Sequence, residues 1–343
     1  MASPSISELS LHGEIGWPWR VDCDRQANLN AMAPAKSWPR VSIVTPSYNQ
    51  AEFIEETIRS VLLQGYPNLE YIVIDGGSTD GSVDIIRRYE PWLEYWVSEA
   101  DQGQSHAINK GWARSSGEIV AWLNSDDVYY PSAICSAVAA LSRQREVAGV
   151  YSNAALIDGN GDLIALKRPC VFDFGRLLWN LGSYIPQPTT FLRNLVLEEV
   201  GFLDEELQYS MDYELWLRIG MRFALGYVDE TWAATRFHRE AKTVTSQPEI
   251  WEQKEKVLRK TFASPFLSVD WRSKATVIIS AYYFKRAMVN LRGLRVLHTF
   301  RCIGRAIRLK PDLLLDRQNW WRLLHTVWQL VRRGRRLKYW PTA

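Results

Sequence analysis

Residues 41–127 alternate between short apolar runs and segments with helical spacing, and this alternation constrains the fold more than any other feature. The apolar runs are 41–45, 69–74, 95–98 and 118–123, and the helical segments between them are 53–64, 82–89 and 105–115. Strands that alternate with helices of about 10–15 residues form βαβ units with a mainly parallel sheet. We therefore predict an α/β fold whose mixed, mainly parallel, Rossmann-related sheet is flanked by helices.

Polar loops follow three of these strands, at residues 45–49, 75–81 and 124–127. Ligands of open α/β sheets bind beyond the carboxyl ends of the strands. Because the three loops meet at one edge of the predicted sheet, we expect them to form one binding site.

The loop at residues 75–81 reads Asp-Gly-Gly-Ser-Thr-Asp-Gly. A dinucleotide-binding G-x-G-x-x-G frame needs glycine where Ser78 stands, so that fingerprint is absent, and the chain has no G-x-x-x-x-G-K-[ST] phosphate loop. Two interpretations stay open for this loop. It is either a turn followed by a helix N-cap, or it presents Asp75 to a nucleobase or ribose.

Asn124-Ser125-Asp126-Asp127 directly follows an apolar strand. Two neighbouring carboxylates repel each other, and Mg²⁺ or Mn²⁺ can compensate them with diphosphate oxygens as further ligands. The alternative is that Asp127 caps a helix at residues 129–141.

Three more residues have both a structural and a functional interpretation. A lone histidine such as His238 is more often structural than a metal ligand. Asp212 and Glu214 begin an apparent helix, where acidic side chains suit the first turn. A carboxylate at that position can also act as a general base.

Five motifs, taken together in chain order, resemble those of family 2 glycosyltransferases. They are VSIVTPSYN at 41–49, DGGSTDG at 75–81, GQSHAINKG at 103–111, LNSDD at 123–127 and MDYELW at 211–216. The resemblance implies the GT-A fold, in which a nucleotide-binding α/β unit is fused to an acceptor-binding half. Members of that family transfer a sugar from a nucleoside diphosphate sugar with inversion and use a divalent metal.

The resemblance also implies roles for the matching residues. It assigns the nucleotide sugar to Thr45, Pro46, Tyr48, Asp75, Asn109, Lys110, Asn124 and Ser125. It assigns Mn²⁺ or Mg²⁺ to Asp126 and His238, the proton of the acceptor hydroxyl to Asp212, and the acceptor side to Gln187 and Glu214.

The sequence departs from the family pattern at three positions. Asn124 replaces the first Asp of the D-x-D metal motif, so we expect weaker metal binding. His106 stands where many relatives carry Asp, and Met211 replaces the Glu that precedes the catalytic Asp.

The charge of the chain is divided unevenly. Residues 265–343 carry 17 Lys and Arg against 3 Asp, whereas the other 264 residues carry 24 basic and 35 acidic side chains. Within this basic tail, Trp320, Leu324, Val327, Trp328 and Val331 form one helical stripe. A basic amphipathic helix suits an anionic membrane surface; the alternative is a helix packed on the body, and we expect no nucleic-acid partner.

The expected organisation is a lead-in at 1–39, a GT-A domain at 40–262 whose nucleotide-binding half ends near residue 145, and a basic amphipathic helical extension at 263–343. No 18-residue apolar run lacks charge and the N-terminus does not resemble a signal peptide. The four cysteines form no C-x-x-C pair, which favours a reducing compartment. We expect a cytoplasmic protein, with peripheral attachment to the inner face of the plasma membrane through the tail.

The predicted function is a metal-dependent inverting transfer of a sugar from a nucleoside diphosphate, weighted to UDP, onto a hydroxyl of a saccharide or lipid-linked acceptor in surface polysaccharide synthesis. The alternative is a non-catalytic binding protein for nucleotide sugars or carbohydrates that derives from this family. A nucleotidyltransferase would carry a Gly-rich basic loop after the first strand, and Thr45-Pro46-Ser47-Tyr48 is not such a loop.

Overall fold

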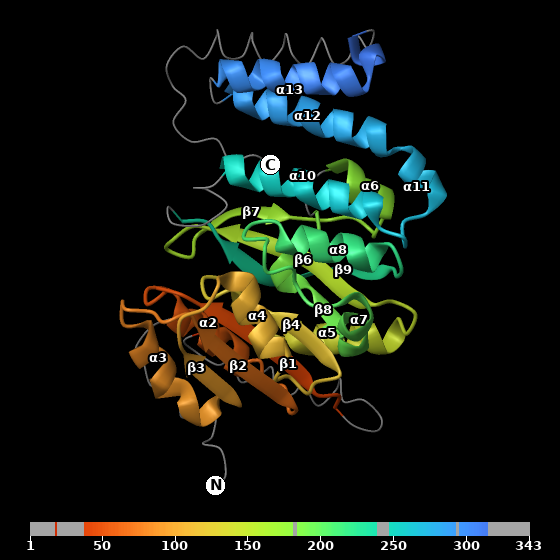
Figure 1. Ribbon diagram of the computed structural model, residues 1–343. Coiled ribbons are helices and arrows are strands. Elements are labelled where there is room, and N and C mark those ends of the chain that lie inside the picture. The colour runs from red at the N-terminus through yellow and green to blue at the C-terminus, as the bar shows by residue number, and fades with distance from the viewer. Residues whose placement is uncertain (1–17, 19–37, 181–183, 239–246, 293–294, 315–343) are drawn as a thin grey trace. The chain divides into compact units, whose positions relative to one another are not determined.

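The computed structural model describes residues 18, 38–180, 184–238, 247–292 and 295–314 (Figure 1). The strands are β1 (Val41–Ser47), β2 (Leu69–Asp75), β3 (Tyr95–Ser98), β4 (Ile119–Trp122), β5 (Val128–Tyr129), β6 (Gly149–Ile157), β7 (Leu163–Lys167), β8 (Phe191–Arg193) and β9 (Leu225–Arg236). The helices are α2 (Ile54–Leu62), α3 (Ser82–Tyr89), α4 (Gln104–Trp112), α5 (Ala133–Arg143), α6 (Phe174–Asn180), α7 (Asn194–Val200), α8 (Met211–Gly220), α10 (Gln247–Ala263), α11 (Val269–Ser273), α12 (Ala275–Arg292) and α13 (Val296–Leu309). Short 3-10 turns lie at Glu90–Trp92, Gln187–Thr189 and Pro311–Leu314.

The strands of the described residues form one sheet in the order β3-β2-β1-β4-β8-β6-β9-β5, and β7 pairs with β6 outside this path. The first four strands are parallel, β8 runs antiparallel to both β4 and β6, and β6 is parallel to β9. The predicted mixed, mainly parallel sheet flanked by helices is therefore confirmed. Its parallel half brings the carboxyl ends of β1 to β4 to one edge, where the polar loops leave the sheet.

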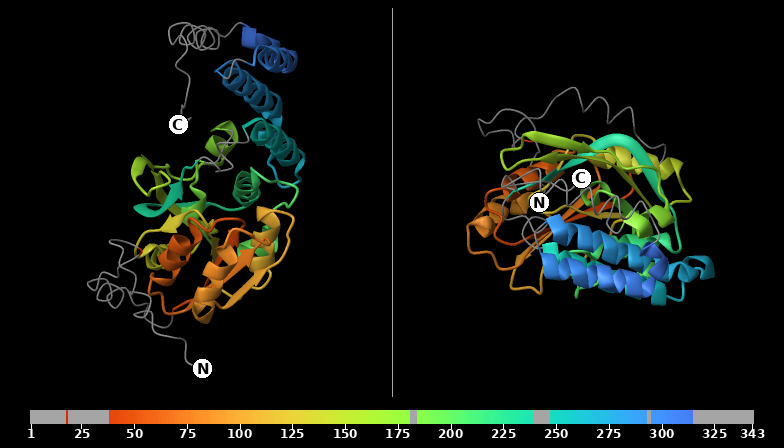
Figure 2. Two further views of the ribbon diagram at one scale, coloured as in Figure 1. Left: turned by 90° about the vertical axis from the view of Figure 1, so that its left-hand side faces the viewer. Right: turned by 90° about the horizontal axis from the view of Figure 1, so that it is seen from above.

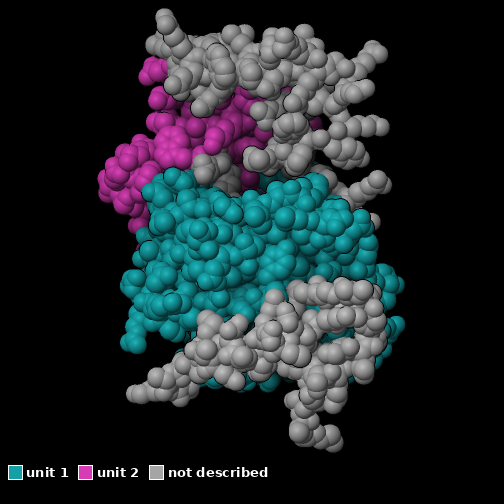
Figure 3. Space-filling view, turned by 180° about the vertical axis from the view of Figure 1, so that it is seen from behind, with its two compact units in different colours: residues 1–177, 182–250 teal, residues 178–181, 251–343 magenta. Residues whose placement is uncertain are grey.

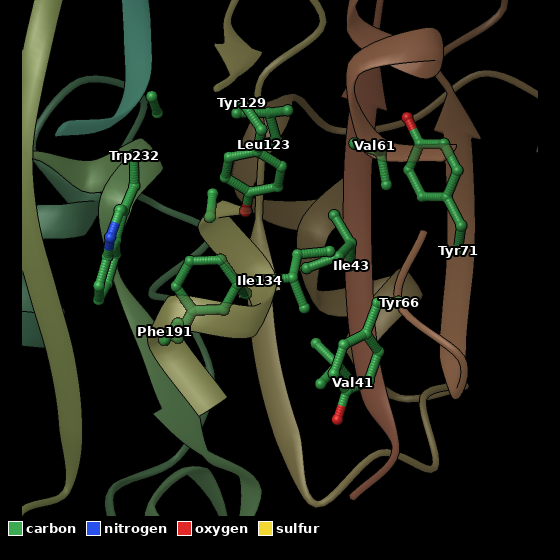
Figure 4. Packing of buried hydrophobic residues seen from close by; sticks show 14 of the residues in the cluster. Val41, Ile43, Val61, Tyr66, Tyr71, Leu123, Tyr129, Ile134, Phe191 and Trp232 are labelled. Carbon is green, nitrogen blue, oxygen red and sulfur yellow. The ribbon is translucent and has the colours of Figure 1, made fainter. Parts of the chain in front are cut away.

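Helices α2, α3 and α5 cover one face of the sheet, and their apolar side chains make the main core (Figure 4). Val41, Ile43 and Tyr71 point from β1 and β2 into this core, and Phe191 and Trp232 extend it under the second half of the sheet. On the opposite face α4 lies against β1, where a Cβ on Gly111 would collide with the Val44 side chain. A side chain at position 111 would push α4, and the residues at its N-terminus, away from the sheet.

The starts of β1 and β2, at the opposite ends from the polar loops, are joined by a buried carboxylate. Glu70 accepts hydrogen bonds from the hydroxyl of Ser42 and from the backbone N–H and hydroxyl of Ser116, each of the latter at 2.8 Å. Arg40 completes the group with an ion pair at 3.0 Å. Burial alone would raise the pKa of Glu70, but these hydrogen bonds and the Arg40 charge lower it below its ordinary value.

Several segments differ from the sequence-based expectation. Strands β8 and β9 were not predicted, because β8 is only three residues long and β9 includes the polar residues Asp229 and Glu230. Helix α5 begins at Ala133, and the residue before it is Ser132, so the interpretation of Asp127 as a helix N-cap is wrong.

The chain divides into two compact units, residues 1–177 with 182–250 and residues 178–181 with 251–343 (Figure 3). The division lies inside α10, whereas the expected boundary at 262 falls at the end of that helix. In the second unit α12 and α13 lie side by side (Figure 2). None of the helices in the described ranges is both long and apolar enough to span a bilayer. The predicted stripe at 320–331 and nearly all of the lead-in at 1–39 lie outside the described residues.

Candidate functional site

The loops after β1 and β2 are fastened to each other by hydrogen bonds. The backbone N–H of Asn49 donates to Ser78 Oγ at 2.7 Å, and Asn49 Oδ1 accepts from the N–H of Thr79 at 2.9 Å. Asp80 Oδ2 accepts from the N–H of Ala51 at 2.8 Å. Asn49 has a positive φ of 52°, a conformation that asparagine adopts more readily than most residues. The two loops therefore form one preformed surface.

Asp75 lies fully buried beneath this surface. Its carboxylate accepts hydrogen bonds from the N–H groups of Gly77 and Ser78 and from the hydroxyls of Ser78 and Ser98, at 2.5–3.1 Å. The structure thus places Asp75 where it shapes its own loop. Of the residues assigned to the nucleotide sugar, Tyr48 is the exposed one, with 62% of its surface exposed.

Thr45 and Pro46 lie beneath the loops. Thr45 is fully buried and its hydroxyl lies 3.0 Å from the hydroxyl of Tyr71, and Pro46 is also buried. Both residues therefore support the loop that carries Tyr48 and are themselves covered.

Asn109 and Lys110, on α4, already have protein partners. The Asn109 amide donates to the carbonyl of Leu203 at 2.9 Å and to Glu205 Oε1 at 2.8 Å, and it accepts from the N–H of Leu203. Lys110 forms an ion pair with Glu99, in the loop after β3. Asn109 thus ties α4 to the segment that leads into α8.

Asn124 lies at the centre of a hydrogen-bonded group after β4. Its carbonyl oxygen accepts from Gln104 Nε2 at 2.6 Å, and its Nδ2 lies 3.1 Å from Asp127 Oδ2 and 3.2 Å from Gln187 Oε1. Gln187 also donates to the carbonyl of Trp122 at 2.7 Å. Ser125 is buried within the turn. An aspartate at position 124 could not donate to Asp127 or Gln187, which gives a physical reason for the departure from D-x-D.

Asp126 and His238 come together although 112 residues separate them. His238 Nε2 lies 3.1 Å from Asp126 Oδ2, with 11% of the His238 side chain and 22% of the Asp126 side chain exposed. The ring of Phe53 supports the imidazole, with the two centroids 4.9 Å apart. The two adjacent carboxylates differ in exposure, because Asp126 reaches the surface while Asp127 is buried. Of the two, only Asp126 is open to a ligand.

Arg236 holds this pair in place. Its Nε donates to the carbonyl of Asp126 at 3.0 Å, and its Nη1 donates to the carbonyls of Asp158 and Gly159 at 3.3 and 3.2 Å. Its Nη2 pairs with Glu56 of α2 at 2.5 Å. One buried guanidinium therefore joins β9, α2, the β6–β7 turn and the turn after β4.

Asp127 is buried behind Asp126, where the backbone N–H of Arg236 donates to its Oδ1 at 3.0 Å. Desolvation and the neighbouring charge of Asp126 raise the pKa of Asp127 well above its ordinary value, while the hydrogen bonds from Arg236 and Asn124 act in the opposite direction. A raised pKa reduces the repulsion that two adjacent carboxylates would otherwise have.

Asp212 lies in the first turn of α8 and is connected to the Asn124 turn through α4. The sulfur of Met211 lies 2.9 Å from Ser105 Oγ, and the neighbouring Gln104 donates to Asn124. Lys167, the last residue of β7, is a cation near Asp212. Desolvation of the ammonium group lowers the pKa of Lys167, and the nearby Asp212 carboxylate opposes that shift.

Glu214 occupies a different environment from Asp212. Its side chain is buried and accepts from Arg218 Nε at 2.8 and 3.0 Å. Arg218 also donates to the carbonyls of Gly201 and Phe202. The structure therefore places Glu214 in the packing between α8 and the end of α7, and it places Gln187 beside Asn124.

The donor set offers a divalent metal two ligands. Among the described residues, no three His, Cys, Asp or Glu side chains cluster closely enough to hold a metal by themselves. Asp126 and His238 would supply one carboxylate oxygen and one imidazole nitrogen to such a metal. The other coordination positions would go to ligand oxygens and water.

Sequence reasoning missed Gln104, Lys167 and the anchoring role of Arg236. Arg236 had a signal, since it stands only two residues before His238 in the sequence. Gln104 stands in the 103–111 motif, but nothing in the sequence indicated its partner Asn124. Lys167 had no signal, because Asp212 is distant from it in the sequence.

Comparisons with known proteins agree on one family. The family model for glycosyl transferase family 2 matches residues 42–197. An uncharacterized glycosyltransferase of Rickettsia typhi is 32% identical over an alignment of 223 residues that covers 62% of this chain and 69% of that protein. One of Mycobacterium tuberculosis is 32% identical over 190 residues, covering 54% of this chain and 70% of that protein.

Solved structures of low sequence identity share the fold. Residues 1–349 of S. aureus TarS match with a TM-score of 0.59 at 17% identity, covering 88% of this chain and 94% of that chain. The match to the longer TarS chain covers only 56% of it. The mannosyltransferase PcManGT of Pyrobaculum calidifontis, solved with GDP-Man and Mn²⁺, matches with a TM-score of 0.56 at 18% identity, covering 90% of this chain and 88% of that chain.

Proposed function

Because this chain belongs to glycosyl transferase family 2, and is thus a glycosyltransferase, we propose that it moves a sugar from a nucleoside diphosphate to an acceptor hydroxyl with inversion. The observation that carries this proposal is the convergence of separate loops. Asp126 meets His238, and Asp212 connects to the same turn through Met211, Ser105 and Gln104. This arrangement supports a metal-holding pair and a lone base within one site.

The donor half binds the nucleotide on the surface made by the loops after β1 and β2. The exposed Tyr48 ring stacks on the base, while Asp75, Thr45 and Pro46 hold the surface in shape from below. UDP is the expected nucleotide. A structure of TarS 1–349 contains UDP-GlcNAc and that of PcManGT contains GDP-Man, so donors of both kinds occur on this fold.

The reaction needs a single displacement at the anomeric carbon. Asp212 takes the proton of the acceptor hydroxyl, the acceptor oxygen bonds to the anomeric carbon, and the bond to the phosphate oxygen breaks with its electron pair. General-base assistance of this kind contributes about 10²–10⁴-fold. The positive charge of Lys167 stabilises the ionised Asp212 before the proton transfer.

Asp126 and His238 would hold Mn²⁺ or Mg²⁺, which supplies Lewis-acid stabilisation of the leaving diphosphate when bound. Gln187 and Asn124 fix the turn that carries Asp126, with Gln187 on the acceptor side of that turn. The acceptor is a saccharide or lipid-linked hydroxyl in surface polysaccharide synthesis, and the enzyme works at the inner face of the plasma membrane.

A donor panel tests this function. The full chain is incubated with UDP-, GDP- and dTDP-sugars and Mn²⁺, and slow release of the nucleotide is measured. We expect release from one nucleotide class, loss of release in Asp126→Ala, and weaker nucleotide binding in Tyr48→Ala. Equal nucleotide binding but no release from any donor, with or without saccharide acceptors, would favour the non-catalytic alternative.

A further inference from the structure

Helices α12 and α13 form a strongly basic hairpin. Residues 275–309 contain seven Lys and Arg and no Asp or Glu. Thr299, Cys302 and Ala306 form the buried face of α13, and the Ser280 hydroxyl on α12 donates to the carbonyl of Ala306 at 3.0 Å. This packing fixes the rotation of α13 and therefore decides which of its side chains remain outside.

The outer side of α13 is apolar along one part and cationic along the next. Val296, Leu297 and Phe300 are exposed at 52%, 74% and 68% of their surface. Arg301 and Arg308 are also exposed, and they follow Leu297 at spacings of four and eleven residues along the same side of the helix. Scattered exposed apolar residues are common, but three within five residues beside two exposed arginines form a defined surface.

We infer that this side of α13 docks on an anionic lipid bilayer. Leu297 and Phe300 enter the boundary between headgroups and acyl chains, and Arg301 and Arg308 contact the lipid phosphates. This inference rests on the proposed function, which places the enzyme at the plasma membrane, and it identifies the surface that would contact the bilayer. A nucleic acid would engage the arginines but would leave the apolar side chains in water, whereas a bilayer accommodates both.

The test is co-sedimentation of the full chain with vesicles of phosphatidylcholine alone or with about one fifth phosphatidylglycerol. We expect binding only to the anionic vesicles, and weaker binding as the salt concentration rises. Because each surface arginine contributes about fivefold to partitioning, the double variant Arg301→Gln/Arg308→Gln should bind about 30-fold less. Leu297→Ser/Phe300→Ser should also lose binding at unchanged charge.

The matched control is Arg143→Gln/Arg145→Gln, which removes the same charge from exposed positions of α5 and of the residues after it. It should bind vesicles like the wild type, and all variants should keep the wild-type melting temperature. Equal vesicle binding by the α13 variants and the wild type, or no binding by any of them, would overturn the proposal. Nucleotide release measured without vesicles reports separately on the catalytic proposal, since α13 contributes none of the residues assigned to the donor site.

Discussion

Replacement of Arg236 by methionine should both destabilise the first compact unit and disrupt the Asp126–His238 pair. The variant keeps much of the side-chain volume but removes the donors to the carbonyls of Asp126, Asp158 and Gly159 and the partner of Glu56. Removing one partner of a buried ion pair costs about 3–5 kcal/mol. Glu56 is 25% exposed, so water can satisfy part of its charge, and we take the lower end, about 3 kcal/mol.

For a domain of this size, about 1 kcal/mol corresponds to roughly 2–4 °C in melting temperature. We therefore expect the unfolding of the first unit to shift down by roughly 6–12 °C in a thermal scan followed by circular dichroism. Arg236→Lys keeps the charge but cannot reach all three carbonyls, so its shift should lie between those of the wild type and Arg236→Met. A matched exposed change, Arg145→Met, should stay within about 0.5 kcal/mol of the wild type.

A second readout separates positioning from stability. At a temperature where Arg236→Met is still folded, Mn²⁺ binding measured with nucleotide present should weaken, because the turn carrying Asp126 has lost its anchor. The reasoning is refuted if Arg236→Met melts within about 1 °C of the wild type, a shift that corresponds to less than about 0.5 kcal/mol.

Three further predictions follow from the described contacts. Asp212→Asn should lower sugar transfer by about 10²–10⁴-fold while nucleotide affinity, measured by calorimetry, stays within about twofold; near-full transfer would show that another group is the base. Asn124→Asp restores the D-x-D sequence, but it places a carboxylate against Asp127 and removes the donor to Gln187. It should therefore lower the free energy of unfolding by about 1–3 kcal/mol. An unchanged midpoint of urea unfolding would contradict this. The pKa of Glu70 is lowered from its ordinary value of 4.5, so the ionised carboxylate stabilises the fold above pH 4.5, and this stabilisation is lost as the pH falls through the native pKa. Glu70→Gln should therefore be less stable than the wild type at pH 7 and approach the wild-type stability near pH 3. The same difference in unfolding free energy at both pH values would rule this out.

The parallel half of the fold was predictable because its signals are local. The apolar runs at 41–45 and 69–74 lie within β1 and β2, and the helix expected at 82–89 is observed at Ser82–Tyr89. Each of these elements is decided by spacing within about ten residues. β9 was missed because its pairing with β6, nearly 80 residues away, decides its structure.

The location of the candidate site was predictable, but the contacts within it were not. Strand ends indicate where loops gather, whereas the partners of each side chain depend on packing between distant segments. The Asn109 amide donates a hydrogen bond to the carbonyl of Leu203, and Asp75 accepts one from the backbone N–H of Ser78. No spacing in the sequence indicates either contact. The motif positions thus point to residues of the candidate site, but they do not indicate which of these residues would contact a ligand and which would support the surrounding structure.

The fastening of Asn49 to Ser78 and Thr79 has a thermodynamic consequence for the donor. A ligand that meets loops already held in one conformation does not have to order them, so the entropy lost on association comes mainly from the ligand itself. Nucleotide binding to this enzyme should then resemble a rigid fit, with little slow conformational relaxation after mixing. Cutting one of these ties, for example with Ser78→Ala, would transfer that ordering cost to the moment of binding.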